Sequence, residues 1–383
     1  MLELIAFLIP ILFFSVYFLR KLKVPTVLGY ILVGLLMAYL FPGIKSSEEM
    51  LYLNFFYELA IALLFFYIGL EFSFKNIIEG LKSYKLAIID FLLNFFPIFF
   101  ISLLFFDLKV AIILALALYP SSTALVTRLL VEYKRLANKE SFYLINILIL
   151  EDLVIVLALV FLSPILVGKN FTIDSLFLII GKLVLVFLIY LLFRKFFLVY
   201  LKKIFKESQT EDYFILFLIG TILFLNILLK KFGIIEYLGS FLLGSLISEI
   251  NKGEFTMRYL LSFKEFSLAI FFFMFGLNLN ISNFDFSLLL LILLLSFVSI
   301  IFKIISTYFS IYIVTKDKFS SLRASMSFVP KGEFSIVLSS LNSKTQILTL
   351  PVVIITIIIG TFLFIFANKV TNKLLISLKN KSS

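Results

Sequence analysis

Two carboxylates, Glu151 and Asp152, adjoin each other inside a long apolar stretch of the chain. Apolar runs at 147–150 and 153–156 flank them. A charge at the centre of a bilayer costs on the order of 3 kcal/mol on insertion scales, so charges at this depth indicate function. A carboxylate accepts either a hard monovalent cation or a proton. Competition between these ions for one aspartate is the chemistry of an exchanger, because either ion neutralises the site.

Lys303 lies in the middle of another apolar stretch, residues 284–315. A lysine near a helix end can extend its ammonium group to the membrane surface, but Lys303 is far from both ends. We therefore expect it to be a functional charge in the membrane. The chain contains no His, so a transported proton must be carried by Asp152, Glu151 or Lys303.

Two further apolar segments are interrupted by proline and polar residues. One reads Tyr-Pro-Ser-Ser-Thr at 119–123, and the other reads Val-Pro-Lys-Gly-Glu at 329–333. Proline removes a backbone N–H and disfavours helix at the residue before it. In a membrane, the freed backbone groups are tolerated only against protein or a water-filled cavity. These breaks make four residues candidates for the site: Ser122, Thr123, Lys331 and Glu333. The last two are expected to pair with each other or to cap a half-helix.

The composition of the 383-residue chain excludes most other chemistry. Apolar residues make up 62% and charged residues 15%, with a mean hydropathy of +1.15. Soluble domains average about 45–50% apolar residues and about 25% charged residues. A soluble enzyme is therefore excluded, and an all-helical polytopic membrane protein is indicated. Without Cys or His there is no thiolate site, no Ser-His dyad and no H-E-x-x-H zinc protease. We expect no enzyme activity and no cofactor beyond the transported ions.

Apolar stretches alternate with charged loops along the whole chain and predict about 13 transmembrane helices. Most of the 34 Lys and Arg residues fall in alternate loops. By the positive-inside rule those loops are cytoplasmic, which places the N-terminus outside and the C-terminus inside the cell membrane. The net charge of +11 is therefore read as a topology signal and not as a nucleic-acid surface. Asp90 and Asn94 lie nearer the cytoplasmic end of the 84–106 segment.

The sequence also repeats itself. Residues 27–34 resemble 237–244 at an offset of 210, and residues 65–70 resemble 272–277 at an offset of 207. The two interrupting prolines differ by 210 as well. The matched elements lie an odd number of spans apart, so the halves must insert in opposite orientations, as in inverted-repeat transporters. We predict two inverted six-helix repeats with crossing discontinuous helices. Their boundaries are 1–167 for the first repeat, 168–210 for a linker helix, and 211–383 for the second repeat with a short cytoplasmic tail.

Several motifs resemble those of a known family. They are Pro-Thr-Val-Leu-Gly-Tyr at 25–30, Gly-Leu-Glu at 69–71, Ser-Ser-Thr-Ala at 121–124, Glu-Asp at 151–152 and Lys-Gly-Glu-Phe at 331–334. In this order they resemble the second branch of the monovalent cation:proton antiporter family. That branch holds Na⁺/H⁺ antiporters and the glutathione-gated K⁺ efflux systems. The resemblance covers essentially the whole chain.

The resemblance implies roles for the candidate residues. Asp152 matches the essential aspartate that binds Na⁺ and a proton in turn, and Lys303 resembles the lysine that pairs with the preceding acidic residue. An acidic residue at position 151 is associated with electrogenic exchange, although the family has Asp, Asn or Gln there and this chain has Glu. Ser122 and Thr123 match the extended region of the first broken helix. Glu333 matches that of the second.

The resemblance favours a Na⁺/H⁺ exchanger that works by alternating access, in the lipid bilayer and as a homodimer. The chain ends without the nucleotide-binding domain of the gated K⁺ systems, which favours Na⁺ over K⁺. A K⁺/H⁺ antiporter or K⁺ efflux transporter is the first alternative. Others are a sodium-coupled organic-anion symporter, an ion channel and an intramembrane aspartyl protease. The sequence leaves the choice among Na⁺, Li⁺ and K⁺ open.

Overall fold

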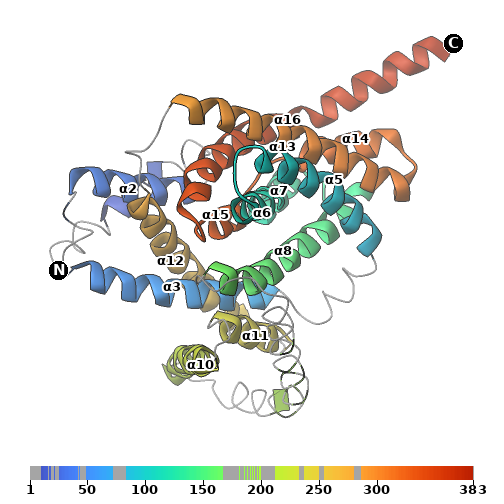
Figure 1. Ribbon diagram of the computed structural model, residues 1–383. Coiled ribbons are helices and arrows are strands. Elements are labelled where there is room, and N and C mark those ends of the chain that lie inside the picture. The colour runs from blue at the N-terminus through green and yellow to red at the C-terminus, as the bar shows by residue number, and fades with distance from the viewer. Residues whose placement is uncertain are drawn as a thin grey trace. The chain divides into compact units, whose positions relative to one another are not determined.

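The computed structural model describes residues 26–41, 49–71, 83–166, 212–232, 237–249, 254–279 and 286–382, with scattered positions at 10–21, 43 and 181–199. Within these ranges the chain forms helices and connecting turns and no strand (Figure 1). The predicted all-helical fold class is confirmed. The predicted linker helix, 168–210, lies mostly outside the described residues. The predicted domain boundaries, the count of about 13 spans and the inverted repeat remain predictions.

The helices belong to two compact units, each built from both halves of the chain. Unit 1 comprises residues 1–76 and 160–278, and unit 2 comprises residues 77–159 and 279–383. Unit 1 contains α2 (Thr26–Leu40), α3 (Glu49–Glu71), α10 (Asp212–Lys231), α11 (Tyr237–Ser248) and α12 (Glu254–Asn278). Unit 2 contains α5 (Tyr84–Leu103), α6 (Leu108–Ala117), α7 (Thr123–Glu132), most of α8 (Lys139–Leu166), α13 (Phe286–Thr315), α14 (Lys318–Ser327), α15 (Glu333–Ser339) and α16 (Ser343–Ser382).

Five helices in the described part of the chain are long and apolar enough to cross a membrane. They are the segments Met50–Leu70, Tyr84–Leu103, Lys139–Leu159, Leu288–Thr315 and Ser343–Lys373. Length and composition are the basis of this assignment, since a span needs about 20 mainly apolar residues. Four of the five contribute to unit 2, which also contains the shorter helices α6, α7, α14 and α15.

In unit 1, α2 and α12 pack backbone against backbone. A Cβ atom added to Gly34 of α2 would collide with the carbonyl of Phe273, and one added to Gly276 of α12 would collide with the carbonyl of Ile31. Small residues let the two backbones come this close in membrane helices. Helices in lipid associate through van der Waals packing, because the hydrophobic effect does not drive them together.

The pair α3 and α11 uses the same device. Gly69 lies against the carbonyl of Phe241, and Gly244 lies against the carbonyl of Phe66. These glycines come from the segments that repeat in the sequence at offsets of 210 and 207. The repeat therefore preserves positions at which helices need a missing side chain.

Unit 2 contains two broken helices. The segments predicted as interrupted spans form α6 and α7 on either side of Pro120, and α14 and α15 on either side of Pro330. Asp107 caps the start of α6 by accepting a hydrogen bond from the backbone N of Val110 (2.9 Å). Asp317 caps the start of α14 by accepting from the backbone N of Phe319 (3.0 Å). The first half of each broken helix thus has its own start signal.

An apolar cluster holds α5, α6, α13 and α16 together. Ile98, Leu114, Leu295 and Val352, one from each helix, are buried in it. The cluster follows Asp90 and Asn94 along α5 and precedes Lys303 along α13. The charged groups of unit 2 therefore lie beside a tightly packed apolar region.

The glycine contacts generate the first prediction. Gly244→Val should lower the thermal stability of the detergent-solubilised protein, because overpacking costs about 1–3 kcal/mol and a carbonyl group cannot move aside. Gly220→Val is the matched control, since a Cβ at Gly220 meets nothing within 4 Å. The midpoint for loss of the monodisperse species on heating measures both. Equal losses in the two variants would contradict the packing argument.

Candidate functional site

Three fully buried charged side chains meet in unit 2. The ammonium group of Lys303 on α13 forms an ion pair with Glu151 on α8. It also donates to Oδ2 of Asp90 on α5 at 2.9 Å. The exposed fraction of each of the three residues is 0%. A charged group that is buried away from water is tolerated only when it is paired and hydrogen-bonded. Here one ammonium group contacts two carboxylates.

The two helix breaks cross each other next to this cluster. The backbone N of Ser122 in the first break donates to the carbonyl of Pro330 in the second at 2.7 Å. The hydroxyl of Ser121 donates to the carbonyl of Phe328 at 2.7 Å. A Cβ at Gly332 would collide with Ser122, so a glycine is needed where the segments meet. Backbone groups freed by the breaks thus bond to each other across the crossing.

Lys331 closes the end of α6. Its ammonium group donates to the carbonyl of Tyr119 at 3.0 Å, and the side-chain amide of Asn94 donates to the same carbonyl at 2.8 Å. The last carbonyls of a helix have no partner within it, and these two donors satisfy one carbonyl just past the end of α6. Of the two roles that the sequence allowed for Lys331, capping a half-helix is the one that the geometry shows. Glu333 opens α15, where a carboxylate suits the positive helix end.

The adjacent carboxylates of α8 make different contacts with the first break. Oε2 of Glu151 accepts a hydrogen bond from the backbone N of Ser121 at 2.7 Å. Oδ2 of Asp152 accepts from the hydroxyl of Thr123 at 2.8 Å. Thr123 is the first residue of α7, so Asp152 reaches the positive end of a half-helix. Asp152 is 2% exposed, so its carboxylate is buried with the hydroxyl oxygen of Thr123 beside it.

The structure places most of the predicted site residues in this region and gives one of them a local role. Glu151, Asp152, Thr123, Lys303 and Lys331 contact the crossing or the buried charge cluster through the bonds described above. Ser122 also contacts the crossing through its backbone N, whereas its hydroxyl caps α7 by accepting from the backbone N of Leu125 at 3.2 Å. The contribution of each residue to ion binding remains a prediction.

Sequence reasoning did not include Asp90 among the site residues. The sequence placed Asp90 nearer the cytoplasmic end of its segment, away from the other candidates, whereas the structure buries it completely. The available signal was spacing: Asp90, Asn94 and Ser102 lie on the buried face of α5. Polar residues at intervals of four in an apolar helix share one face and indicate a polar partner helix. Here that partner is α13, which supplies Lys303 and Ser306.

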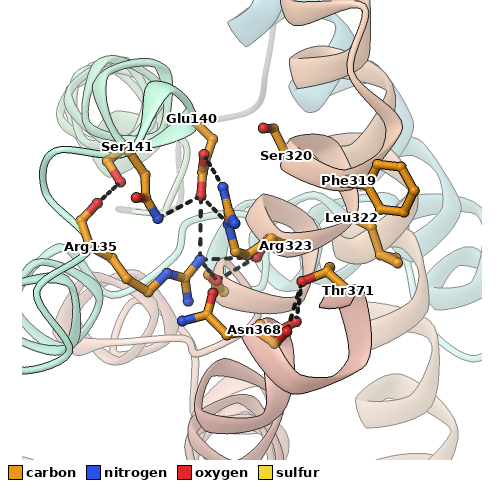
Figure 2. Close-up of polar contacts among 12 residues, drawn as sticks. Arg135, Glu140, Ser141, Phe319, Ser320, Leu322, Arg323, Asn368 and Thr371 are labelled. Carbon is orange, nitrogen blue, oxygen red and sulfur yellow. Dashed lines mark hydrogen bonds and ion pairs between the residues drawn. The ribbon is translucent and has the colours of Figure 1, made fainter. Parts of the chain in front are cut away.

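A second buried ion cluster lies where the α7–α8 turn meets α14 and α16 (Figure 2). Glu140 accepts hydrogen bonds from Nε and Nη2 of Arg323 at 2.5 and 2.9 Å and lies 3.8 Å from the guanidinium of Arg135. Arg135 also donates to the hydroxyl of Ser327 at 2.9 Å and stacks on the ring of Phe364 at 4.5 Å. Burial lowers the pKa of Arg135 to about 10, so its guanidinium stays charged at neutral pH.

Comparison with known proteins gives this architecture a family. The model of the family described as "Sodium/hydrogen exchanger, transmembrane" matches residues 4–370. This chain belongs to the sodium/hydrogen exchanger family. The resemblance inferred from the sequence motifs is confirmed. Family membership also confirms the general prediction of a multi-pass membrane transporter for cations and protons. The family is one of transporters and not of enzymes.

Among curated proteins, this exchanger-family chain is 30% identical over 371 residues to the ammonium/H⁺ antiporter subunit AmhT of Alkalihalophilus pseudofirmus, covering 95% of this chain and 92% of that protein. It is 27% identical over 306 residues to the K⁺/H⁺ antiporter subunit KhtU of Bacillus subtilis, covering 78% and 73%. The sodium proton antiporter MjNhaP1 of Methanocaldococcus jannaschii has the same fold, with TM-scores of 0.60 and 0.66 in two structures at 18% and 16% identity; each alignment covers 98% of this chain and 98–99% of the other.

The second ion cluster generates the next prediction. Glu140→Gln should lower the thermal stability, because removing one partner of a buried ion pair costs about 3–5 kcal/mol. Here it leaves the buried guanidinium of Arg135 and the partly exposed one of Arg323 without their carboxylate. Glu132→Gln is the control, since Glu132 is exposed at the end of α7. Thermal unfolding of both variants in detergent is the measurement. A Glu140→Gln variant as stable as the control would show that the cluster contributes little.

Proposed function

We propose that this protein exchanges a monovalent cation, with Na⁺ as the first candidate, for protons across the cell membrane by alternating access. The observation that carries the proposal is the contact of Asp152 with Thr123 beside the crossing of two broken helices. Inverted-repeat transporters bind their ions where discontinuous helices meet, near the middle of the membrane. Family membership supports the same conclusion.

Asp152 is the proposed carrier of both ions. In the outward or inward cavity its carboxylate binds either the cation or a proton, with the hydroxyl oxygen of Thr123 as a further ligand. An ionised carboxylate is costly to move through apolar surroundings, whereas the neutralised one is not. Because both ions neutralise the same group, the site crosses only when occupied, and the two fluxes are coupled.

Three further features belong to the proposal. The N-terminus faces outside, the C-terminus is cytoplasmic, and the protein works as a homodimer. The chain consists of two inverted six-helix repeats. The offset of 210 supports this, because it relates Pro120 to Pro330, and the capping residue Asp107 to Asp317.

K⁺ or NH₄⁺ is the second candidate for the transported cation. The names of the relatives from Bacillus subtilis and Alkalihalophilus pseudofirmus support it, since they specify K⁺/H⁺ and ammonium/H⁺ exchange. Carboxylate and hydroxyl oxygens accept all of these ions. Transport compared among Na⁺, K⁺, Li⁺ and NH₄⁺ salts discriminates between them. Currents without proton coupling would favour a channel instead, and uptake of a labelled organic acid a symporter.

Asp152→Asn should abolish cation-dependent dequenching of a pH-sensitive dye in everted vesicles, because the amide cannot exchange a proton for a cation. Asp107→Asn is the matched control: Asp107 is exposed at the start of α6, and asparagine caps helices as well as aspartate does. Full activity of Asp152→Asn would overturn the assignment.

Glu151→Gln should weaken or abolish net charge movement, because the variant loses the second carboxylate of α8 that an extra proton could occupy. Currents from proteoliposomes on a solid-supported membrane measure this, with the cation flux of the same preparation as the reference. Unchanged current per transported cation would remove Glu151 from the proton count.

A further inference from the structure

Lys303 is held by more groups than a simple ion pair requires. Its ammonium group pairs with carboxylates from two helices, Asp90 on α5 and Glu151 on α8. It also lies 4.8 Å from the ring centre of Phe328 and 5.3 Å from that of Tyr119. Aromatic faces attract a nearby cation. Each buried charge has to be removed from water at a large cost, so a second carboxylate at one ammonium group calls for a physical reason.

The two carboxylates are anchored to different parts of unit 2. Oδ1 of Asp90 accepts a hydrogen bond from Ser306 at 2.7 Å, less than one turn beyond Lys303 on the same helix. The hydroxyl of Ser310, a turn further along, donates to the carbonyl of Leu86 at 3.1 Å. Both carboxylate oxygens of Asp90 therefore accept hydrogen bonds from side chains of α13, within a continuous polar contact between α5 and α13.

Glu151 is anchored to the other side of Lys303. Its second oxygen accepts from the backbone N of Ser121, which belongs to the first helix break. The next residue is Asp152, the proposed carrier of the ions. Any rearrangement of the break or of the carrier during transport changes the surroundings of Glu151, whereas the bonds of Asp90 do not involve the break.

We propose that Asp90 is the resident counter-charge of Lys303 and keeps the ammonium group paired when Glu151 moves or loses its charge. Asp90 is thus a positioning residue that acts through Lys303. This inference rests on the proposed function for its role in transport. The pairing itself is a property of the folded protein and can be tested without a transport assay.

A double-mutant cycle tests the pairing. Asp90→Asn and Glu151→Gln each leave Lys303 one carboxylate, so each should lower the midpoint of thermal unfolding in detergent only modestly. The double variant leaves a buried ammonium group with no carboxylate, so its midpoint should fall by more than the sum of the two single shifts. Additive shifts would overturn the proposal.

A rescue variant separates charge pairing from packing. Adding Lys303→Met to the double variant removes the unpaired ammonium group at similar side-chain volume and should raise the midpoint again. Ser306→Ala is the control: it removes the other hydrogen bond of Asp90 but no charge, and Lys303→Met should not raise the midpoint in that background. If the double variant does not fold, the triple variant should still yield folded protein, and its failure to do so would overturn the proposal.

The outcome of the thermal double-mutant cycle is independent of the proposed function. Wild-type protein that moved no cation in vesicles would defeat the exchanger assignment and leave the thermal cycle unaffected. Conversely, an additive cycle in a protein that transports normally would defeat only the role of Asp90.

Discussion

The cost of placing charge in apolar surroundings governs the arrangement of unit 2. Lys303, Glu151 and Asp90 are entirely buried and bind one another, and Lys331 is buried against a helix end. At the turn between α7 and α8, Glu140 lies between Arg135 and Arg323 in the same way. Except for Arg135 and Glu140, which are neighbours at one turn, these contacts join helices that are far apart in the sequence. The charged residues therefore specify which helices are neighbours, while the apolar residues supply most of the packing.

The helix breaks follow from the same constraint. A continuous helix satisfies its own backbone, so it offers no polar groups to a site in the membrane. Pro120 and Pro330 interrupt two helices, and the freed groups bond to each other and to the side chains of Lys331 and Glu151. Long helices then hold a small region of irregular backbone next to the contact of Asp152 with Thr123.

Much of this was accessible from the sequence because the signals are local. Apolar length predicted the helices, the prolines predicted the breaks, and isolated charges singled out Glu151, Asp152 and Lys303. The contact of Asp90 with Lys303 was not accessible, because it depends on the pairing of α5 with α13 across more than two hundred residues. The capping role of Ser122 was missed for a different reason. A serine beside a proline fits a ligand and a helix cap equally well, and only the bond to Leu125 distinguishes them.

The glycine contacts of unit 1 restrict which amino-acid substitutions this protein can accept during evolution. A clash between two side chains can be relieved by a shorter neighbour, so most packed positions can vary together with their partners. Gly34, Gly69, Gly244 and Gly276 face carbonyl groups, which are identical in every residue type. No second substitution nearby can make room for a side chain at these positions. A substitution at one of these glycines therefore cannot be compensated by a second substitution nearby. Sequence variation in unit 1 is confined to other positions.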